Sequence, residues 1–148
     1  MAWFFKYVDE LFEFDDPHPR SYKLVYELVK SISENDTPVL FLSYILNLIA
    51  DLGLSPELFS CTVCNRPFKP TCQIAFSPKE GLVHRYCCSD NLMPCTKNDI
   101  KLMRIILNYP FRRVARAKIN ISSLRRAYKL VRSYFIWHFG KELPEKLL

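Results

Sequence analysis

Apolar residues recur at three- and four-residue intervals along most of the chain, the spacing that puts them on one face of a helix. Between Cys61 and Cys95 this periodicity is lost, so we expect a non-helical module there. Elsewhere the pattern predicts helices over residues 2–14, 20–32 and 37–52, and one more helical turn at 55–57. It also predicts a helix after Thr96, whose hydroxyl can cap amides near Asp99, that ends near Pro110, and a last helix from Ser122 or Ser123 to Phe139, closed by Gly140.

The helix at 37–52 is expected at the centre of the core. Its apolar run from Val39 to Ala50 is 12 residues long, is interrupted by Ser43 and Asn47, and is apolar nearly all the way round. A membrane span needs about 18 or more such residues, so the run predicts a buried helix and no membrane contact. Gly53 is expected to end this helix in a left-handed conformation.

Two other helices indicate which side chains should face the core. In the helix at 20–32, the repeating apolar positions are Tyr22, Val25, Tyr26 and Val29. In the last helix, we expect an inward stripe of Leu124, Ala127, Tyr128, Val131, Tyr134, Phe135 and His138, and a cationic row of Arg125, Lys129 and Arg132 on another face.

Two pairs of metal-binding residue types in the module share the same two-residue gap. Cys61 and Cys64 form the first pair, His84 and Cys87 form the second, and 19 residues separate them. Two tight turns with two such ligands each can close a tetrahedron around zinc, so the spacing predicts a structural zinc site. Four protein ligands leave no position for a water nucleophile, so we expect no catalysis there. Asn65 tolerates the left-handed backbone that such a turn often needs.

The three remaining cysteines keep the ligand set open at this stage. Cys88 is an alternative to Cys87, and Cys72 or Cys95 is an alternative to His84. No secretory signal precedes these residues, so we expect a reducing, cytoplasmic location. In that compartment paired cysteines hold a metal more often than they form a disulfide.

Charge divides the chain into an acidic part and a basic part. The 148 residues have a net charge of +6, but residues 1–60 hold 4 basic and 10 acidic residues, whereas residues 100–141 hold 11 basic residues and no acidic one. A one-signed segment in a small domain indicates a surface for a polyanion. Arginine grips phosphate with two parallel hydrogen bonds, which favours backbone contact over base reading. The candidate residues for DNA phosphates or an acidic protein tail are Arg112, Arg113, Arg116, Arg125, Arg126, Lys129 and Arg132.

Several motifs of the chain resemble the bacterial recombination mediator family RecO. The similarity covers nearly the whole chain and includes YVDEL at 7–11, HRYC at 84–87 and WHFGKEL at 137–143. Its most specific part is IADLGLSPEL at 49–58, which leads into the CTVC pair at 61–64. Two differences are His84, where the family usually has cysteine, and Glu80 before Gly81, where the family has a double glycine.

This resemblance implies an all-α fold, namely a helical bundle of residues 1–60 and 96–148 with a small zinc-ribbon-like module of residues 61–95 inserted in it. It also implies a DNA repair and recombination protein that binds single- and double-stranded DNA, single-stranded DNA-binding protein (SSB) and RecR, and that supports strand annealing and recombinase loading. Family members carry an N-terminal OB-fold of roughly 80 residues ahead of the part matched here, a usual surface for single strands.

Composition and motifs together favour a globular protein without enzyme activity. With 49% apolar and 24% charged residues the chain is typical of a compact globular domain, which excludes disordered and fibrous classes. No catalytic triad, paired-carboxylate motif or phosphate loop stands out, so we expect no enzyme activity. The alternative hypothesis is a protein–protein interaction module or a zinc-ribbon adaptor that does not bind DNA.

Overall fold

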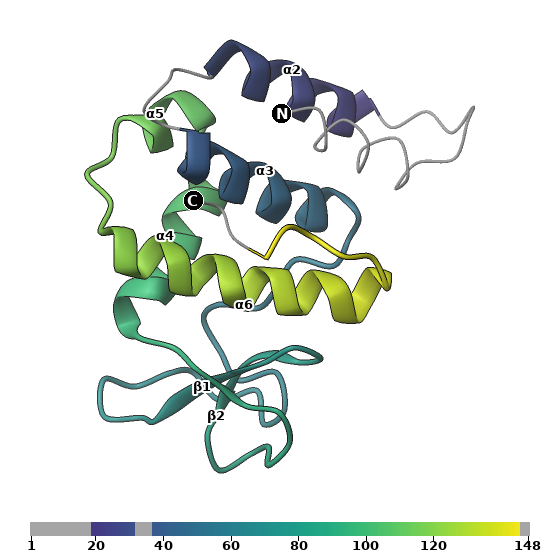
Figure 1. The fold of residues 1–148 in the computed structure, drawn as a ribbon. Helices are drawn as coiled ribbons and strands as arrows, with labels where there is room; N and C mark the ends of the chain where they lie inside the picture. Colours follow the sequence, from purple (N-terminus) through teal and green to yellow (C-terminus); the bar gives the residue numbers. More distant parts are fainter. Residues whose placement is uncertain (1–18, 32–36, 146–148) are drawn as a thin grey trace.

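The computed structural model describes residues 19–31 and 37–145, and the helix expected at 2–14 lies outside them. Figure 1 shows a helical part above a small sheet. In chain order the described elements are α2 (Pro19–Ser31), α3 (Thr37–Asp51), β1 (Ile74–Ser77), β2 (Gly81–His84), β3 (Met93–Pro94), α4 (Lys97–Asn108), α5 (Phe111–Ala115) and α6 (Ile121–Phe139).

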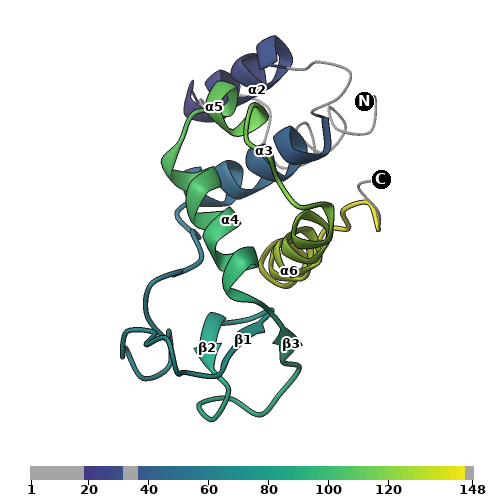
Figure 2. The ribbon, with the colours of Figure 1, turned by 90° about the vertical axis from the view of Figure 1, so that its left-hand side faces the viewer.

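Helix α3 lies at the centre of the helical part, as its apolar pattern predicts. Leu40, Leu46 and Ile49 lie on different sides of this helix, and all three are fully buried. Helices α2, α4, α5 and α6 each pack against it, and Figures 1 and 2 show them grouped around it. None of the helices among the described residues is long and apolar enough to cross a membrane.

The apolar face predicted for α2 is wrong at three of its four positions, and only Val25 is half-buried against the core. Tyr22 is 79% exposed, and Tyr26 and Val29 are each 50% exposed, whereas the buried residues of this helix are Ser21 and Leu28. The Ser21 hydroxyl donates a 2.7 Å hydrogen bond to the Asp51 carboxylate at the end of α3. This bond and the burial of Leu28 turn a neighbouring face of α2 toward α3, which periodicity alone did not reveal.

Helix α6 has its predicted inward stripe, with one difference at each end. Leu124, Ala127, Tyr128, Val131, Tyr134 and Phe135 are buried, while His138 is half-buried. The helix begins earlier than expected, because the Asn120 side chain accepts hydrogen bonds from the amides of Ser122 and Ser123. It ends at Gly140 in a left-handed conformation, as predicted.

The helical turn expected at 55–57 is absent, and this segment is a loop. The Glu57 carboxylate accepts hydrogen bonds from the backbone amides of Phe59 and Ser60, at 2.6 and 3.1 Å. These bonds satisfy the amides without a helix and direct the chain into the module.

The fold is not purely all-α, because the module contains a three-stranded antiparallel sheet in the order β2-β1-β3. In its register Phe76 pairs with Leu82 and Ala75 pairs with Val83. Side chains alternate across a sheet, so the first pair joins the helical core and the second packs against Cys61. The sheet therefore separates the helical core from the cysteine-rich face.

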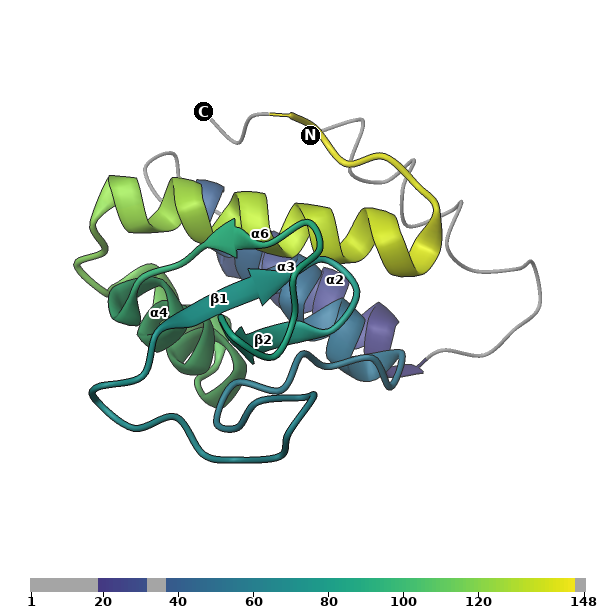
Figure 3. The ribbon, with the colours of Figure 1, turned by 90° about the horizontal axis from the view of Figure 1, so that it is seen from below.

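Side chains of α4 and α6 fix the position of the module on the helices. Arg104 of α4 donates to the Leu58 carbonyl, and the Tyr134 hydroxyl of α6 donates to the Leu54 carbonyl at 3.1 Å. His138 Nε2 lies 3.0 Å from the Lys79 carbonyl oxygen. Figures 2 and 3 show the strands at the end of the molecule opposite α2 and α5.

Candidate metal centre and nucleic-acid interface

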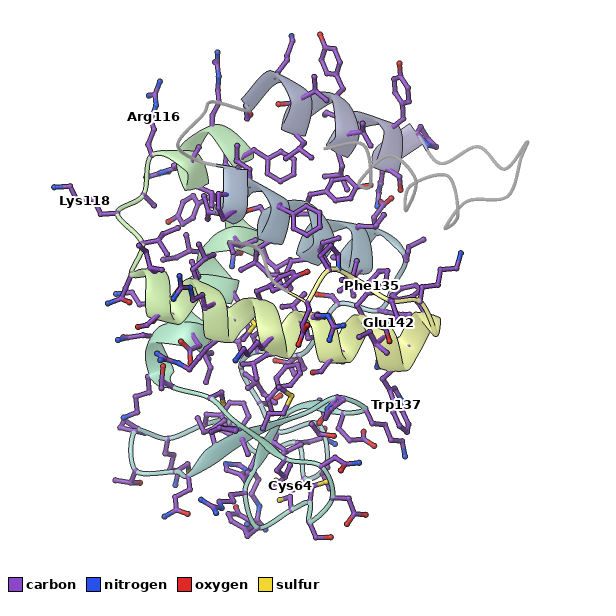
Figure 4. The ribbon with its side chains drawn as sticks, in the orientation of Figure 1. Cys64, Arg116, Lys118, Phe135, Trp137 and Glu142 are labelled. Carbon is purple, nitrogen blue, oxygen red and sulfur yellow. The ribbon has the colours of Figure 1, made fainter. Side chains whose placement is uncertain are left out.

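The four predicted ligands lie together in the module. One ligand atom from each of Cys61, Cys64, His84 and Cys87 lies within 4.8 Å of all the others. Cys61 and His84 are buried, and the other two are half-buried. Figure 4 shows Cys64 at the end of the molecule formed by the module. Within the described ranges, no other group of three or more Cys, His, Asp or Glu side chains has this proximity.

Local hydrogen bonds form the two turns that present these ligands. The Asn65 amide donates to the Cys61 carbonyl at 2.8 Å, and the Cys87 amide donates to the His84 carbonyl at the same distance. Asn65 has a φ of 57°, which confirms the left-handed backbone predicted at this position. Each turn places its first and fourth residues on the same side, as the two-residue gap predicted.

The geometry of the cluster fits a tetrahedral zinc ion. The distance from Cys64 Sγ to His84 Nδ1 is 3.4 Å. Zinc bonds of about 2.3 Å to sulfur and about 2.0–2.1 Å to nitrogen give a tetrahedral edge of about 3.6 Å between such a pair, and about 3.8 Å between two sulfurs. The Cys64–His84 distance is within about 0.2 Å of the expected edge, and no pair exceeds 4.8 Å. Shifts of about 1 Å or less would therefore complete the tetrahedron, with His84 binding through Nδ1.

Two of the three cluster thiols have pKa values shifted in opposite directions. Burial acts to raise the pKa of Cys61, but hydrogen bonds from the backbone amides of Cys64, His84 and Val63 outweigh it and lower this pKa to about 6. Burial and the hydrogen bonds with the other two thiols raise the pKa of Cys87 to about 12. A thiolate at Cys61 therefore disfavours a second thiolate at Cys87, and a divalent cation between them would relieve this repulsion.

The three remaining cysteines lie outside this cluster. Cys72, Cys88 and Cys95 line a neighbouring cleft of about 910 Å³ beside the sheet. Burial, followed by the nearby Asp99 charge, raises the pKa of Cys95 to about 11. The structure therefore brings together the preferred ligand set and none of the alternatives, while metal binding itself stays a prediction.

Two of the seven residues predicted to contact DNA or an acidic tail, Arg126 and Arg132, form ion pairs within this chain. Arg126 binds the buried Asp99 carboxylate through Nε and Nη2, at 2.9 and 3.2 Å. Arg132 lies 2.7 Å from the Glu142 carboxylate and also donates to the Leu143 carbonyl at 2.9 Å. Both guanidinium groups therefore hold parts of this chain together.

The other five predicted residues are exposed. They occupy α5, its connection to α6 and the first half of α6, and Lys118 lies among them. Figure 4 shows Arg116 and Lys118 extending away from the helices. We call the following set the basic surface: Arg112, Arg113, Arg116, Lys118, Arg125 and Lys129.

Asp99 is a structural residue whose full role the sequence did not reveal. The Thr96 hydroxyl accepts from the Asp99 amide, and the Asp99 carboxylate accepts from the Thr96 amide, which confirms the predicted cap of α4. The sequence gives no sign that Arg126 completes the site. Burial acts to raise the pKa of Asp99, but hydrogen bonds from Arg126 and Thr96 lower it below its usual range.

Comparison with known proteins identifies relatives over most of the chain. Residues 2–147 match the family described as "Recombination protein O C terminal". The DNA repair protein RecO of Dehalococcoides mccartyi (strain CBDB1) is 27% identical over 133 residues, which cover 88% of this chain and 52% of that protein. The DNA repair protein RecO of Listeria innocua is 22% identical over 143 residues, which cover 94% of this chain and 55% of that protein. The chain thus spans about half the length of these relatives, and no solved structure matches it significantly.

Proposed function

This chain belongs to the RecO C-terminal family, which links it to DNA repair and recombination, and from that premise we propose that it is a non-enzymatic domain that binds the phosphates of single- and double-stranded DNA. In this proposal it acts with SSB and RecR during strand annealing and recombinase loading. The basic surface makes the DNA contact, and the zinc site has a structural role.

The observation that carries the proposal is the basic surface. Residues 100–141 contain no acidic side chain, so the six exposed cations of this set have no carboxylate partner from their own segment. Cations arranged along a short helix and the start of a longer one suit a backbone that carries a charge at every nucleotide. The support is for phosphate contact and not for recognition of particular bases.

In the same proposal, Cys61, Cys64, His84 and Cys87 would hold a zinc ion. When bound, zinc would compensate the charge of the thiolates and link the two turns, which stabilises the module. The amides of Cys64 and His84 that donate to Cys61 would hold its thiolate in position.

The test is a salt titration of DNA binding. We expect the quadruple variant Arg116→Gln, Lys118→Gln, Arg125→Gln and Lys129→Gln to reduce the slope of log affinity against log salt by about 3, since each phosphate contact contributes about 0.7–0.9. Fluorescence anisotropy with a labelled oligothymidine measures this slope. The matched control removes four charges elsewhere, through Lys23→Gln, Lys30→Gln, Lys69→Gln and Lys79→Gln. Equal slopes for the two quadruple variants would reject the proposal.

A second candidate function is binding of the acidic SSB tail, and one cleft favours it. This cleft, of about 610 Å³, lies between α2, α3 and α5, with Leu24 and Phe111 among its apolar residues and Arg20 and Lys23 among its cations. Two carboxylates, Glu27 and Asp51, also line it, and Asp51 accepts a hydrogen bond from Ser21. In this proposal Arg20 and Lys23 bind the terminal carboxylate of an acidic peptide, and the apolar residues receive its last side chain. Titration with a labelled tail peptide tests it, and we expect Arg20→Gln with Lys23→Gln to weaken peptide binding by about tenfold or more.

A further inference from the structure

An exposed aromatic ring is held flat against the metal centre. Tyr86 lies in the turn between His84 and Cys87, and its ring stacks on the His84 ring with 5.2 Å between centroids and 12° between planes. His84 is itself buried and meets Phe68 edge-on at 5.0 Å. Tyr86 is nevertheless 71% exposed, so the face opposite His84 is open to solvent. A ring already fixed by packing loses little conformational entropy when a ligand stacks on it.

Two arginines lie near this turn, Arg66 in space and Arg85 next to Tyr86 in the chain. Arg85 and Arg66 are both exposed, and neither forms an ion pair with a described residue. The Arg66 charge acts directly on the Tyr86 hydroxyl. The Arg85 amide donates to the Gln73 carbonyl at 2.9 Å, which ties the start of the turn to the chain that leads into β1. Cationic groups therefore lie near the ring, on well-held backbone.

A cleft lies beside the turn that carries the ring, because Arg85 and Cys88, which lie before and after Tyr86 in the chain, both line it. Arg85, which immediately precedes Tyr86, lines the cleft of about 910 Å³ described above, together with Lys97, Gln73 and Ser89. None of its lining residues is acidic, and Ile74 and Leu92 belong to its apolar lining. Cations, an amide and a hydroxyl beside apolar surface are the groups that recognise a nucleotide.

We propose that Tyr86 stacks against an unpaired nucleic-acid base while Arg66 and Arg85 bind the adjacent phosphates and the cleft receives the neighbouring nucleotide. Bases in a duplex stack on each other and offer no free face, so this site selects single strands. It lies at the opposite end of the molecule from α5 and is separate from the basic surface. The inference depends on the proposed function in one respect, that the domain binds nucleic acid.

The experiment compares three substitutions of Tyr86 in the full chain, with metal content measured for each. We expect Tyr86→Ala to weaken binding of a labelled oligothymidine by roughly 5- to 150-fold, the range that base stacking on an aromatic ring supplies. Duplex binding should change by less than about twofold, because that contact uses phosphates alone. Tyr86→Phe keeps the ring and should bind as the unmodified chain does.

Tyr86→Leu is a control for a folding defect, since leucine covers His84 but offers no aromatic face. If Tyr86→Ala loses metal, the comparison of Tyr86→Leu with Tyr86→Phe decides the question, and only the leucine variant should lose affinity. Tyr22→Ala is the matched control, a substitution of an equally exposed tyrosine on α2 that should have no effect. Equal affinities of the leucine and phenylalanine variants, or an equal loss for duplex, would overturn the inference and indicate a protein-contact residue instead. If the unmodified chain does not bind oligothymidine, the proposed function itself fails.

Discussion

Two regions of this molecule group ionisable side chains, one in a largely buried cluster and the other on an exposed surface. At the module end, three thiols and a histidine converge in a largely buried cluster, where a second negative charge is disfavoured. On α5, its connection to α6 and the first half of α6, six cations are spread over exposed positions, where water screens them from one another. The first arrangement calls for a cation inside the fold, and the second leaves positive charge available to an external polyanion.

Because of this difference, we expect substitutions in the two regions to affect stability differently. The cluster brings together residues from turns that are 19 residues apart, so a metal ion bound by all four would link these turns. The members of the basic surface form no ion pair with a described residue, although Arg113 lies over the Tyr109 ring at 4.4 Å. We therefore expect substitutions there to change stability little. Arg104, Arg126 and Arg132 differ from that surface, because their guanidinium groups bind other parts of this chain.

The largest expected effect is the loss of one cluster residue. We predict that Cys64→Ser abolishes metal binding and lowers the free energy of unfolding by several kcal/mol, a substantial part of the roughly 10–16 kcal/mol that a structural zinc ion supplies. Elemental analysis and urea unfolding measure the two effects. Cys72→Ser is the control, and it should keep one ion per chain because Cys72 lies outside the cluster. A metal-free Cys72→Ser variant would contradict the assigned ligand set.

The next effect concerns Asp99 and has a defined pH dependence. We predict that Asp99→Asn destabilises the protein by about 1–3 kcal/mol at pH 7, because it removes a charged partner from Arg126 and weakens the cap of α4. The pKa of Asp99 is lowered in the folded state, so its contribution is complete above the unfolded value of about 3.9 and is lost as the pH falls through the folded value.

Urea unfolding of both proteins between pH 7 and pH 3 checks this sign. The difference between them should be constant down to about pH 5 and should shrink below about pH 4. Acid also releases metal from the cluster, but this affects both proteins and cancels in the difference. A difference that grows on acidification would show that the sign is wrong.

A smaller effect is expected at Asn65, the left-handed residue of the first turn. We predict that Asn65→Ala costs about 1–2 kcal/mol, because a Cβ without a local hydrogen-bonding group disfavours a positive φ. Asn65→Gly should be nearly neutral, since glycine adopts this conformation without a steric penalty. Unfolding curves of the two variants give the comparison, and equal destabilisation by both would point to a lost side-chain contact instead.

The sequence predicted those features that depend on residues close together in the chain. The two turns of the cluster, the Thr96 cap and the left-handed residues Asn65 and Gly140 each involve a spacing of a few residues, and each was found. The central position of α3 also followed from its composition. Metal binding and DNA binding are still predictions, because no spacing of residues measures affinity.

The features that were not predicted depend on contacts between distant residues. The hydrogen bond from Ser21 to Asp51, 30 residues away, helps to determine which face of α2 is buried. Arg126 is held inside the fold by its ion pair with Asp99, 27 residues away. The sheet was missed because its strands are only four, four and two residues long. Such short strands show little alternation, and the helical core and the cysteine cluster cover their two faces.

The smallest and most discriminating effect separates two adjacent arginines of α6. Arg125 is exposed, whereas Arg126 is bound to Asp99. We predict that Arg125→Gln makes the salt slope of DNA binding shallower by about 0.7–0.9 and changes the free energy of unfolding by less than about 0.5 kcal/mol. Arg126→Gln should do the reverse, with an unchanged salt slope and a lower free energy of unfolding, because the buried carboxylate loses its partner.

Each variant is the control for the other, since both remove one positive charge from neighbouring positions of the same helix. Anisotropy titrations over a range of salt and urea unfolding of both proteins complete the test. If the two variants lose the same amount of salt slope, Arg126 must release Asp99 on binding, and the division between internal and external cations fails. If neither changes the slope, the first half of α6 does not contact phosphate, and the basic surface is confined to α5 and the connection that follows it.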